Sequence, residues 1–125
     1  MNAIAVVAAL VAAAIHVFFF LLESLRFERP ETYHRFFVEN EADAEVIRPW
    51  AFNQGFYNLF LAIGAVGGAL ALAAGQVDVG RALVLLACGS MAAAGIVLLA
   101  TDRRFARPAL IQAVPPLIAI VFLFA

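Results

Sequence analysis

Four long apolar runs, separated by polar links, set the limits on what this chain can form. The runs cover about residues 2–22, 50–74, 81–100 and 106–125. An α-helix rises 1.5 Å per residue, so roughly 20 apolar residues cross a hydrocarbon core of about 30 Å. Hydrophobic residues make up 66 % of the chain, against roughly 45–50 % in a soluble domain. The sequence therefore predicts an all-α protein, a membrane four-helix bundle that forms a single domain over residues 1–125.

The polar link between the first two runs has its own pattern. Pro30 can begin a helix, because its missing N–H falls where no helical partner exists. Beyond it, apolar and charged side chains separate onto different faces, which is typical of an amphipathic helix at a membrane surface. We therefore expect an interfacial helix over about residues 31–47. Pro49 is expected to end it, because the residue before a proline avoids helical geometry.

Small residues suggest how the middle runs pack. Gly64 and Gly68 are four residues apart, a spacing that allows close approach of two membrane helices. The third run is also rich in Gly, Ala and Ser, and only the short link 75–80 separates it from the second. We therefore expect the second and third runs to form a closely packed antiparallel hairpin.

Arginine counts predict the orientation. The links 23–49 and 101–107 contain seven arginines, whereas the opposite side contains only Arg81. Because cytoplasmic links are enriched in Lys and Arg, both ends of the chain are expected on the non-cytoplasmic side of the membrane. The net charge of -1 leaves no broad basic face, so nucleic-acid binding is not expected.

The strongly polar side chains of the runs would then lie in one half of the membrane. These are His16, Glu23, Asn53, Gln54, Tyr57, Asn58, Asp102 and Gln112. An amide that faces lipid leaves its donors and acceptors unpaired, so these groups should face the protein interior. Two interpretations remain open: hydrogen bonds that join the helices, or a pocket that opens to the cytoplasm.

In the pocket interpretation, His16 and Glu23 are the candidate catalytic residues, because an ionisable group inside a membrane often has a function. Neutral imidazole both donates and accepts a hydrogen bond and titrates near neutral pH. The ligand-binding candidates are Asn53, Gln54, Tyr57, Asn58, Gln112 and Asp102.

Structural alternatives exist for the ionisable candidates. His16 could be a neutral imidazole hydrogen-bonded inside the bundle, Glu23 could pair with Arg26, and Asp102 could pair with the arginines beside it. The chain shows no metal-binding motif, and a buried His alone is weak evidence for haem. The cofactor is therefore unknown.

Several segments together are similar to a known family. They are His16 with Glu23 seven residues later, the string from Asn53 to Ala62 (NQGFYNLFLA), Ala94-Gly95 with Thr101, and the string from Gln112 to Pro115 (QAVP). In these the chain resembles the DUF1304 family of small bacterial membrane proteins, over nearly its whole length. The resemblance implies four transmembrane helices and a bacterial inner membrane, and it implies no activity.

Three functions are compatible with these patterns. The first is a membrane protein, enzyme or not, whose cytoplasm-facing pocket binds a small or lipid-like ligand, with proton transfer by His16 and Glu23. The second is a small proton-coupled transporter, expected to be a homo-oligomer because four short helices enclose little space. The third is a structural or partner-binding subunit that uses the 31–47 helix as its contact.

Overall fold

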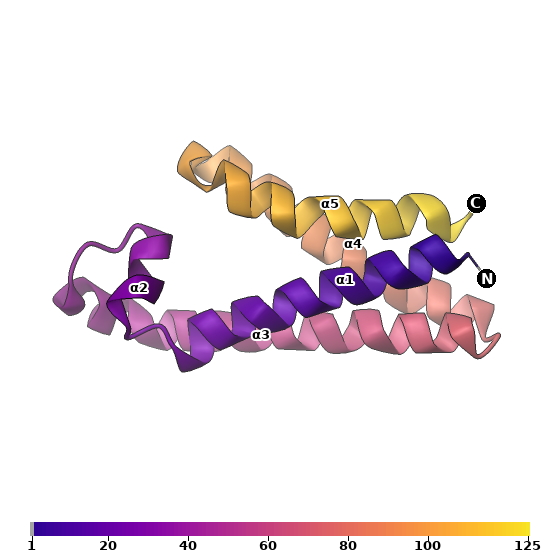
Figure 1. Ribbon diagram of the computed structural model, residues 1–125, viewed down its shortest axis with the longest axis horizontal. Coiled ribbons are helices and arrows are strands. Elements are labelled where there is room, and N and C mark those ends of the chain that lie inside the picture. Colours follow the sequence, from indigo (N-terminus) through magenta and orange to yellow (C-terminus); the bar gives the residue numbers. More distant parts are fainter. Residues whose placement is uncertain (1) are drawn as a thin grey trace. The chain divides into compact units, whose positions relative to one another are not determined.

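The computed structural model describes residues 2–125, and within that range it contains helices and no strand (Figure 1). In chain order the elements are α1 (Ala3–Phe20), the π-helical turn η1 (Leu21–Leu25), α2 (Pro30–Tyr33), the 3-10 turn η2 (His34–Phe36), α3 (Glu41–Ala73), α4 (Val77–Thr101), the 3-10 turn η3 (Arg103–Phe105) and α5 (Ala106–Leu123).

Four of the helical segments within residues 2–125 are long and apolar enough to cross a membrane. They are Ala3–Leu25, Glu41–Ala73, Val77–Thr101 and Arg103–Leu123. The predicted all-α membrane bundle is thereby confirmed, and the protein is a multi-pass membrane protein.

The chain forms two compact units, which are described in turn. The first contains the chain up to His16 and Leu61–Ala125, and the second contains Val17–Phe60. In the first unit the start of α1 and the end of α5 lie at the same end, and consecutive helices run in opposite directions (Figure 1). This is an up-and-down arrangement of four helices.

Alanine dominates the core of the first unit. Its buried cluster takes residues from all four helices: Ala8, Ala9, Ala12, Ala13, Ala62, Ala65, Ala69, Leu72, Val84, Ala87, Cys88, Met91, Ala119 and Leu123. Inside a membrane the lipid is as apolar as the core, so helices associate mainly through van der Waals contact between closely approaching backbones. Small side chains permit that approach.

The α3–α4 pair confirms the expected close hairpin. A Cβ on Gly68 would lie 2.7 Å from Cγ2 and 2.9 Å from the backbone nitrogen of Val84. Nearer the turn, a Cβ on Gly80 would lie 2.9 Å from the backbone nitrogen of Leu72. Gly68 of α3 thus meets Val84 of α4, and the later residue Leu72 of α3 meets the earlier residue Gly80 of α4. The two helices are therefore antiparallel.

The second unit has a small core of its own. It contains Phe27, Tyr33, Val38, Ala44 and Ala51, with Phe36 packed against them. In the same unit, the end of α1 and the middle of α3 meet through aromatic rings, since the centroids of the Phe20 and Phe56 rings are 5.1 Å apart, edge to face.

The predicted helix over 31–47 is wrong in its extent. The α-helix that starts at Pro30 ends at Tyr33. A 3-10 turn follows up to Phe36, and the helical backbone stops at Phe37, which has a φ of 60°. This left-handed backbone is unfavourable for a residue with a side chain, and it cannot continue a right-handed helix. The interfacial segment is therefore a short helix and a turn.

A new helix then begins after Asn40. Oδ1 of Asn40 accepts a hydrogen bond of 2.9 Å from the backbone N–H of Asp43, as an N-cap does. The helix continues through Pro49, contrary to the prediction. Pro49 removes only the bond to the carbonyl of Glu45, and both residues are exposed. The result is one helix of 33 residues, about 50 Å long at 1.5 Å per residue.

We expect Gly68→Ala to lower the free energy of unfolding. Overpacking against Val84 costs about 1–3 kcal/mol, more than the gain of up to about 1 kcal/mol from the helix propensity of alanine. Gly89→Ala is the matched control, since nothing lies within 4 Å of its added Cβ. Unfolding of both variants in detergent, followed by circular dichroism, measures the difference. Equal effects at the two positions would contradict the packing described for α3 and α4.

We also expect Gly55→Ala to be destabilising, because its Cβ would overlap Oγ of Ser24. Ser24→Ala alone should cost about 1 kcal/mol, the usual loss of one hydrogen bond. With both changes the nearest remaining contacts are Cβ and the backbone nitrogen of residue 24, each at 3.0 Å. The double variant should therefore be more stable than the sum of the single effects indicates, by at least about 0.5 kcal/mol. Strict additivity in a double-mutant cycle would argue against this contact.

Candidate functional site

The π-helical turn Leu21–Leu25 carries Glu23 at the end of the first membrane span. In a π-helix the backbone bonds run from residue i to i+5, so the turn is wider than an α-helical one. Such turns are rare inside helices and are frequently found at functional sites. The sequence pattern of an unbroken apolar run did not indicate this turn.

Glu23 and Asn58 form a direct pair within the second unit. Nδ2 of Asn58 donates a hydrogen bond of 2.5 Å to Oε1 of Glu23. Asn58 is only 7 % exposed, and Glu23 is half-buried. The structure thus joins two of the predicted site residues, 35 positions apart in the chain, and Glu23 takes this amide as a partner although Arg26 lies nearby in sequence.

The hydrogen bond between Glu23 and Asn58 is compatible with both protonation states of the Glu23 carboxyl group. A carboxylate only accepts hydrogen bonds, whereas a protonated carboxyl group also donates one. A carboxamide carries both donors and an acceptor, and a half-turn about its last bond exchanges them. Asn58 can therefore remain bonded to Glu23 in either protonation state.

Ser24 and Gly55 hold the pair in place, and sequence reasoning missed both. Oγ of Ser24 donates a hydrogen bond of 2.7 Å to the backbone carbonyl of Phe52. Gly55 lets α3 come that close, because any side chain there would overlap Ser24. A signal was present: Ala51, Gly55 and Asn58 follow the 4,3 spacing of a single helical seam, and all three are buried.

Three other candidates on α3 do not join the pair. Asn53, Gln54 and Tyr57 are exposed, Tyr57 by 59 %. The expectation that all these polar groups face the interior thus fails for these three in the single chain. The physical reason is helical phase: Asn53 and Tyr57 lie on the side of α3 opposite the seam that contains Asn58.

His16 lies in the first unit and is fully buried. Its Nδ1 is 2.8 Å from the carbonyl oxygen of Ala12. A carbonyl can only accept, so Nδ1 carries the proton, and Nε2 is the acceptor atom of the neutral ring. His16 continues the buried seam of Ala5, Ala9 and Ala12, which places the imidazole inside the protein as predicted.

Gln112 and Asp102, also in the first unit, have local partners. Nε2 of Gln112 donates to the carbonyl of Met91 at 3.2 Å and so links α5 to α4. Asp102 forms an ion pair with Arg104 at 2.8 Å. The hydrogen bonds from the Arg104 side chain and backbone N–H hold the pKa of Asp102 below its ordinary value. Asp102 is therefore ionised at neutral pH and fixes the link before α5.

The predicted site residues thus fall into two sets. Glu23, with Asn58, belongs to the second unit, and His16, Gln112 and Asp102 belong to the first. One cytoplasm-facing pocket lined by both sets stays a prediction. Among residues 2–125 no group of three or more His, Cys, Asp or Glu side chains is placed to hold a metal ion.

Among the surface hollows of residues 2–125 are two that are not lined by any predicted site residue. One, of about 310 Å³, lies in the second unit between Phe37, Val38, Glu39, Asp43, Val46 and Ile47. The other, of about 380 Å³, is apolar and lies in the first unit between Ala3, Ile4, Val7, Ala8 and Ile118.

Comparison with known proteins identifies a family for this chain. No curated protein and no solved structure is similar enough to the chain to count as a match. The family described as "Protein of unknown function (DUF1304)" matches residues 10–124. This range includes Glu23, Ser24, Gly55 and Asn58 and covers nearly the whole chain. The protein therefore belongs to the DUF1304 family, as the resemblance in its sequence predicted.

Proposed function

We propose that this membrane protein binds a small or lipid-like ligand at the Glu23–Asn58 pair and exchanges a proton with it. The observation that carries the proposal is the hydrogen bond between these two side chains, on a π-helical turn at the end of a membrane span. A half-buried carboxyl group with a carboxamide partner offers a ligand both a proton and a hydrogen-bond donor or acceptor.

The surroundings of the pair indicate the kind of ligand. Phe20 and Phe56 are three and two positions from Glu23 and Asn58 in the sequence, and their rings meet edge to face. The rings of Phe52 and Phe60 lie tilted against Phe56, with centroids 5.1 and 6.2 Å away. Such a site has one polar group next to a large aromatic surface. We therefore propose an amphipathic ligand, whose polar or basic group meets Glu23 and whose apolar part lies along the phenylalanines.

We further propose that the pair lies at the cytoplasmic side of a bacterial inner membrane, with both ends of the chain on the other side. The support is the distribution of arginines, seven in the links 23–49 and 101–107 against Arg81 alone. In this orientation Glu23 has access to the cytoplasmic proton pool.

Purified protein in detergent should be stabilised by an amphiphile that fits this site. We expect at least one of a fatty amine, a fatty acid, a single-chain phospholipid and an isoprenoid alcohol to raise the melting temperature. A ligand at 100 times its Kd adds about 2.7 kcal/mol to the free energy of unfolding. Glu23→Gln and Asn58→Leu should abolish that shift, whereas Glu28→Gln, which changes an exposed carboxyl group, should retain it.

His16→Ala, tested in the same assay, separates the two sets of candidate residues. Loss of the ligand shift would include His16 in the site, and its retention would leave the site to Glu23 and Asn58. The proposal fails if no compound stabilises the parent protein, or if the stabilisation is unchanged in Glu23→Gln.

The orientation is tested separately by fusions in bacterial cells. Alkaline phosphatase folds only outside the cytoplasm, so a fusion at residue 125 should be active, and a fusion within the link 101–107 should be inactive. Green fluorescent protein should give the reverse pattern. Active phosphatase in the arginine-rich link would invert the proposed topology and place Glu23 on the other side.

A further inference from the structure

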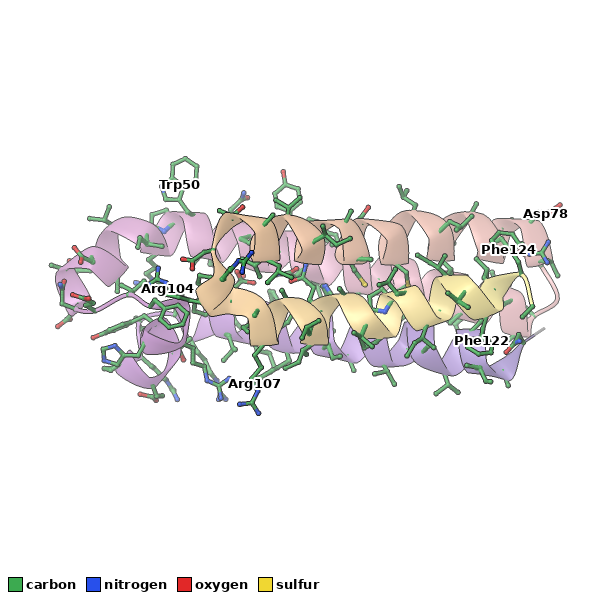
Figure 2. All side chains as sticks on the ribbon, turned by 90° about the horizontal axis from the view of Figure 1, so that it is seen from above. Trp50, Asp78, Arg104, Arg107, Phe122 and Phe124 are labelled. Atoms are coloured by element: carbon green, nitrogen blue, oxygen red, sulfur yellow. The ribbon has the colours of Figure 1, made fainter. Side chains whose placement is uncertain are left out.

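The exposed face of α3 carries a regular stripe of large and polar side chains. Val46, Trp50, Asn53, Tyr57 and Phe60 follow one another at spacings of four, three, four and three residues. Val46 and Trp50 are 73 % and 76 % exposed, Tyr57 and Phe60 are 59 % and 58 % exposed, and Asn53 is exposed as well. Figure 2 shows Trp50 pointing away from its own helix. This spacing is that of a helix that pairs with another helix along a single seam.

The depth of the stripe makes its polar members unusual. The last charged residue of α3 is Arg48, and the helix is apolar in character from Trp50 to Ala73. Asn53 is then about 5 Å and Tyr57 about 10 Å further along the helix than Trp50, at 1.5 Å per residue. A carboxamide directed at hydrocarbon has neither water nor protein to bond with, which is costly in a membrane. A second polypeptide could provide the missing hydrogen bonds.

We propose that a second copy of this chain covers the stripe, forming a parallel dimer with a two-fold axis along the membrane normal. Copies that insert by the same rule share one orientation, so each residue of one copy meets its equivalent at equal depth. A carboxamide has two donors and an acceptor, so Asn53 is complementary to Asn53 of a second copy. A lipid acyl chain offers no such partner, and a different protein would need a matching amide at the same depth.

The opposite face of α3 already has its partners within the chain, which leaves the stripe as the contact surface. Ala51, Gly55 and Asn58 are buried within the chain, and they lie on the side of α3 opposite Trp50, Asn53 and Tyr57. The proposed dimer therefore leaves the Glu23–Asn58 hydrogen bond in place. It does not depend on the ligand proposed for that pair.

Disulfide cross-linking in membranes tests the seam. In a Cys88→Ala background, single cysteines at Val46, Trp50, Asn53 and Tyr57 should form dimers on mild oxidation, because a disulfide needs Cβ atoms about 4 Å apart. Arg48→Cys and Phe52→Cys are matched controls, since both positions are exposed and lie on another face of the same helix. Equal cross-linking at the controls, or none along the stripe, would overturn the proposal.

Dilution in lipid vesicles provides a second measurement. Fluorescence energy transfer between labelled copies should fall as the protein-to-lipid ratio decreases, and Asn53→Leu should weaken dimerisation by about 3- to 30-fold, the range expected for a hydrogen bond between membrane helices. Phe52→Leu should leave it unchanged. A monomer at every ratio would show that Asn53 is hydrated at the headgroup level and that the dimer does not form.

Discussion

Close approach of helices through small side chains is the constraint on which the rest of this structure depends. In hydrocarbon the hydrophobic effect does not drive two apolar helices together. Van der Waals contact between closely approaching backbones must therefore provide the free energy of association. In the first unit this contact comes from alanines and from Gly68 against Val84. In the second unit it comes from Gly55 against Ser24. The Glu23–Asn58 hydrogen bond is possible because that glycine lets the two backbones come together.

Much of the fold could be predicted from the sequence, because membrane spans depend on length and hydrophobicity alone. The four spans and the all-helical class were found in this way. The α3–α4 hairpin was predicted from the small residues and the short link between the two runs. The link between the first two spans could not be predicted correctly. The structure of this link depends on the left-handed backbone of Phe37 and on the N-cap at Asn40. Both are local features, and they override the helical periodicity of the sequence. Pro49 also misled, since a proline at an exposed position interrupts only one hydrogen bond.

The candidate site was predicted in part. Glu23 and Asn58 were both named, but the carboxamides of α3 were treated as one group. The 4,3 seam of small residues through Ala51 and Gly55 separates buried Asn58 from exposed Asn53 and Gln54, and this seam can be read in the sequence. The π-helical turn could not be anticipated, because an apolar run has the same composition whichever way its backbone is wound. The π-helical turn also changes the direction in which the Glu23 side chain points, so that direction cannot be calculated from regular α-helical spacing.

The π-helical turn also makes the first span sensitive to its residue count. A turn closed by bonds from i to i+5 accommodates a residue that a regular α-helix would not. If one residue ahead of the turn, between Val17 and Phe20, were lost and the turn kept its winding, Glu23 would move by one helical position. Successive α-helical positions differ by about 100° in direction, so the carboxyl group of Glu23 would turn away from Asn58. The number of residues in the first span, as well as their type, thus determines whether the Glu23 carboxyl group points toward Asn58.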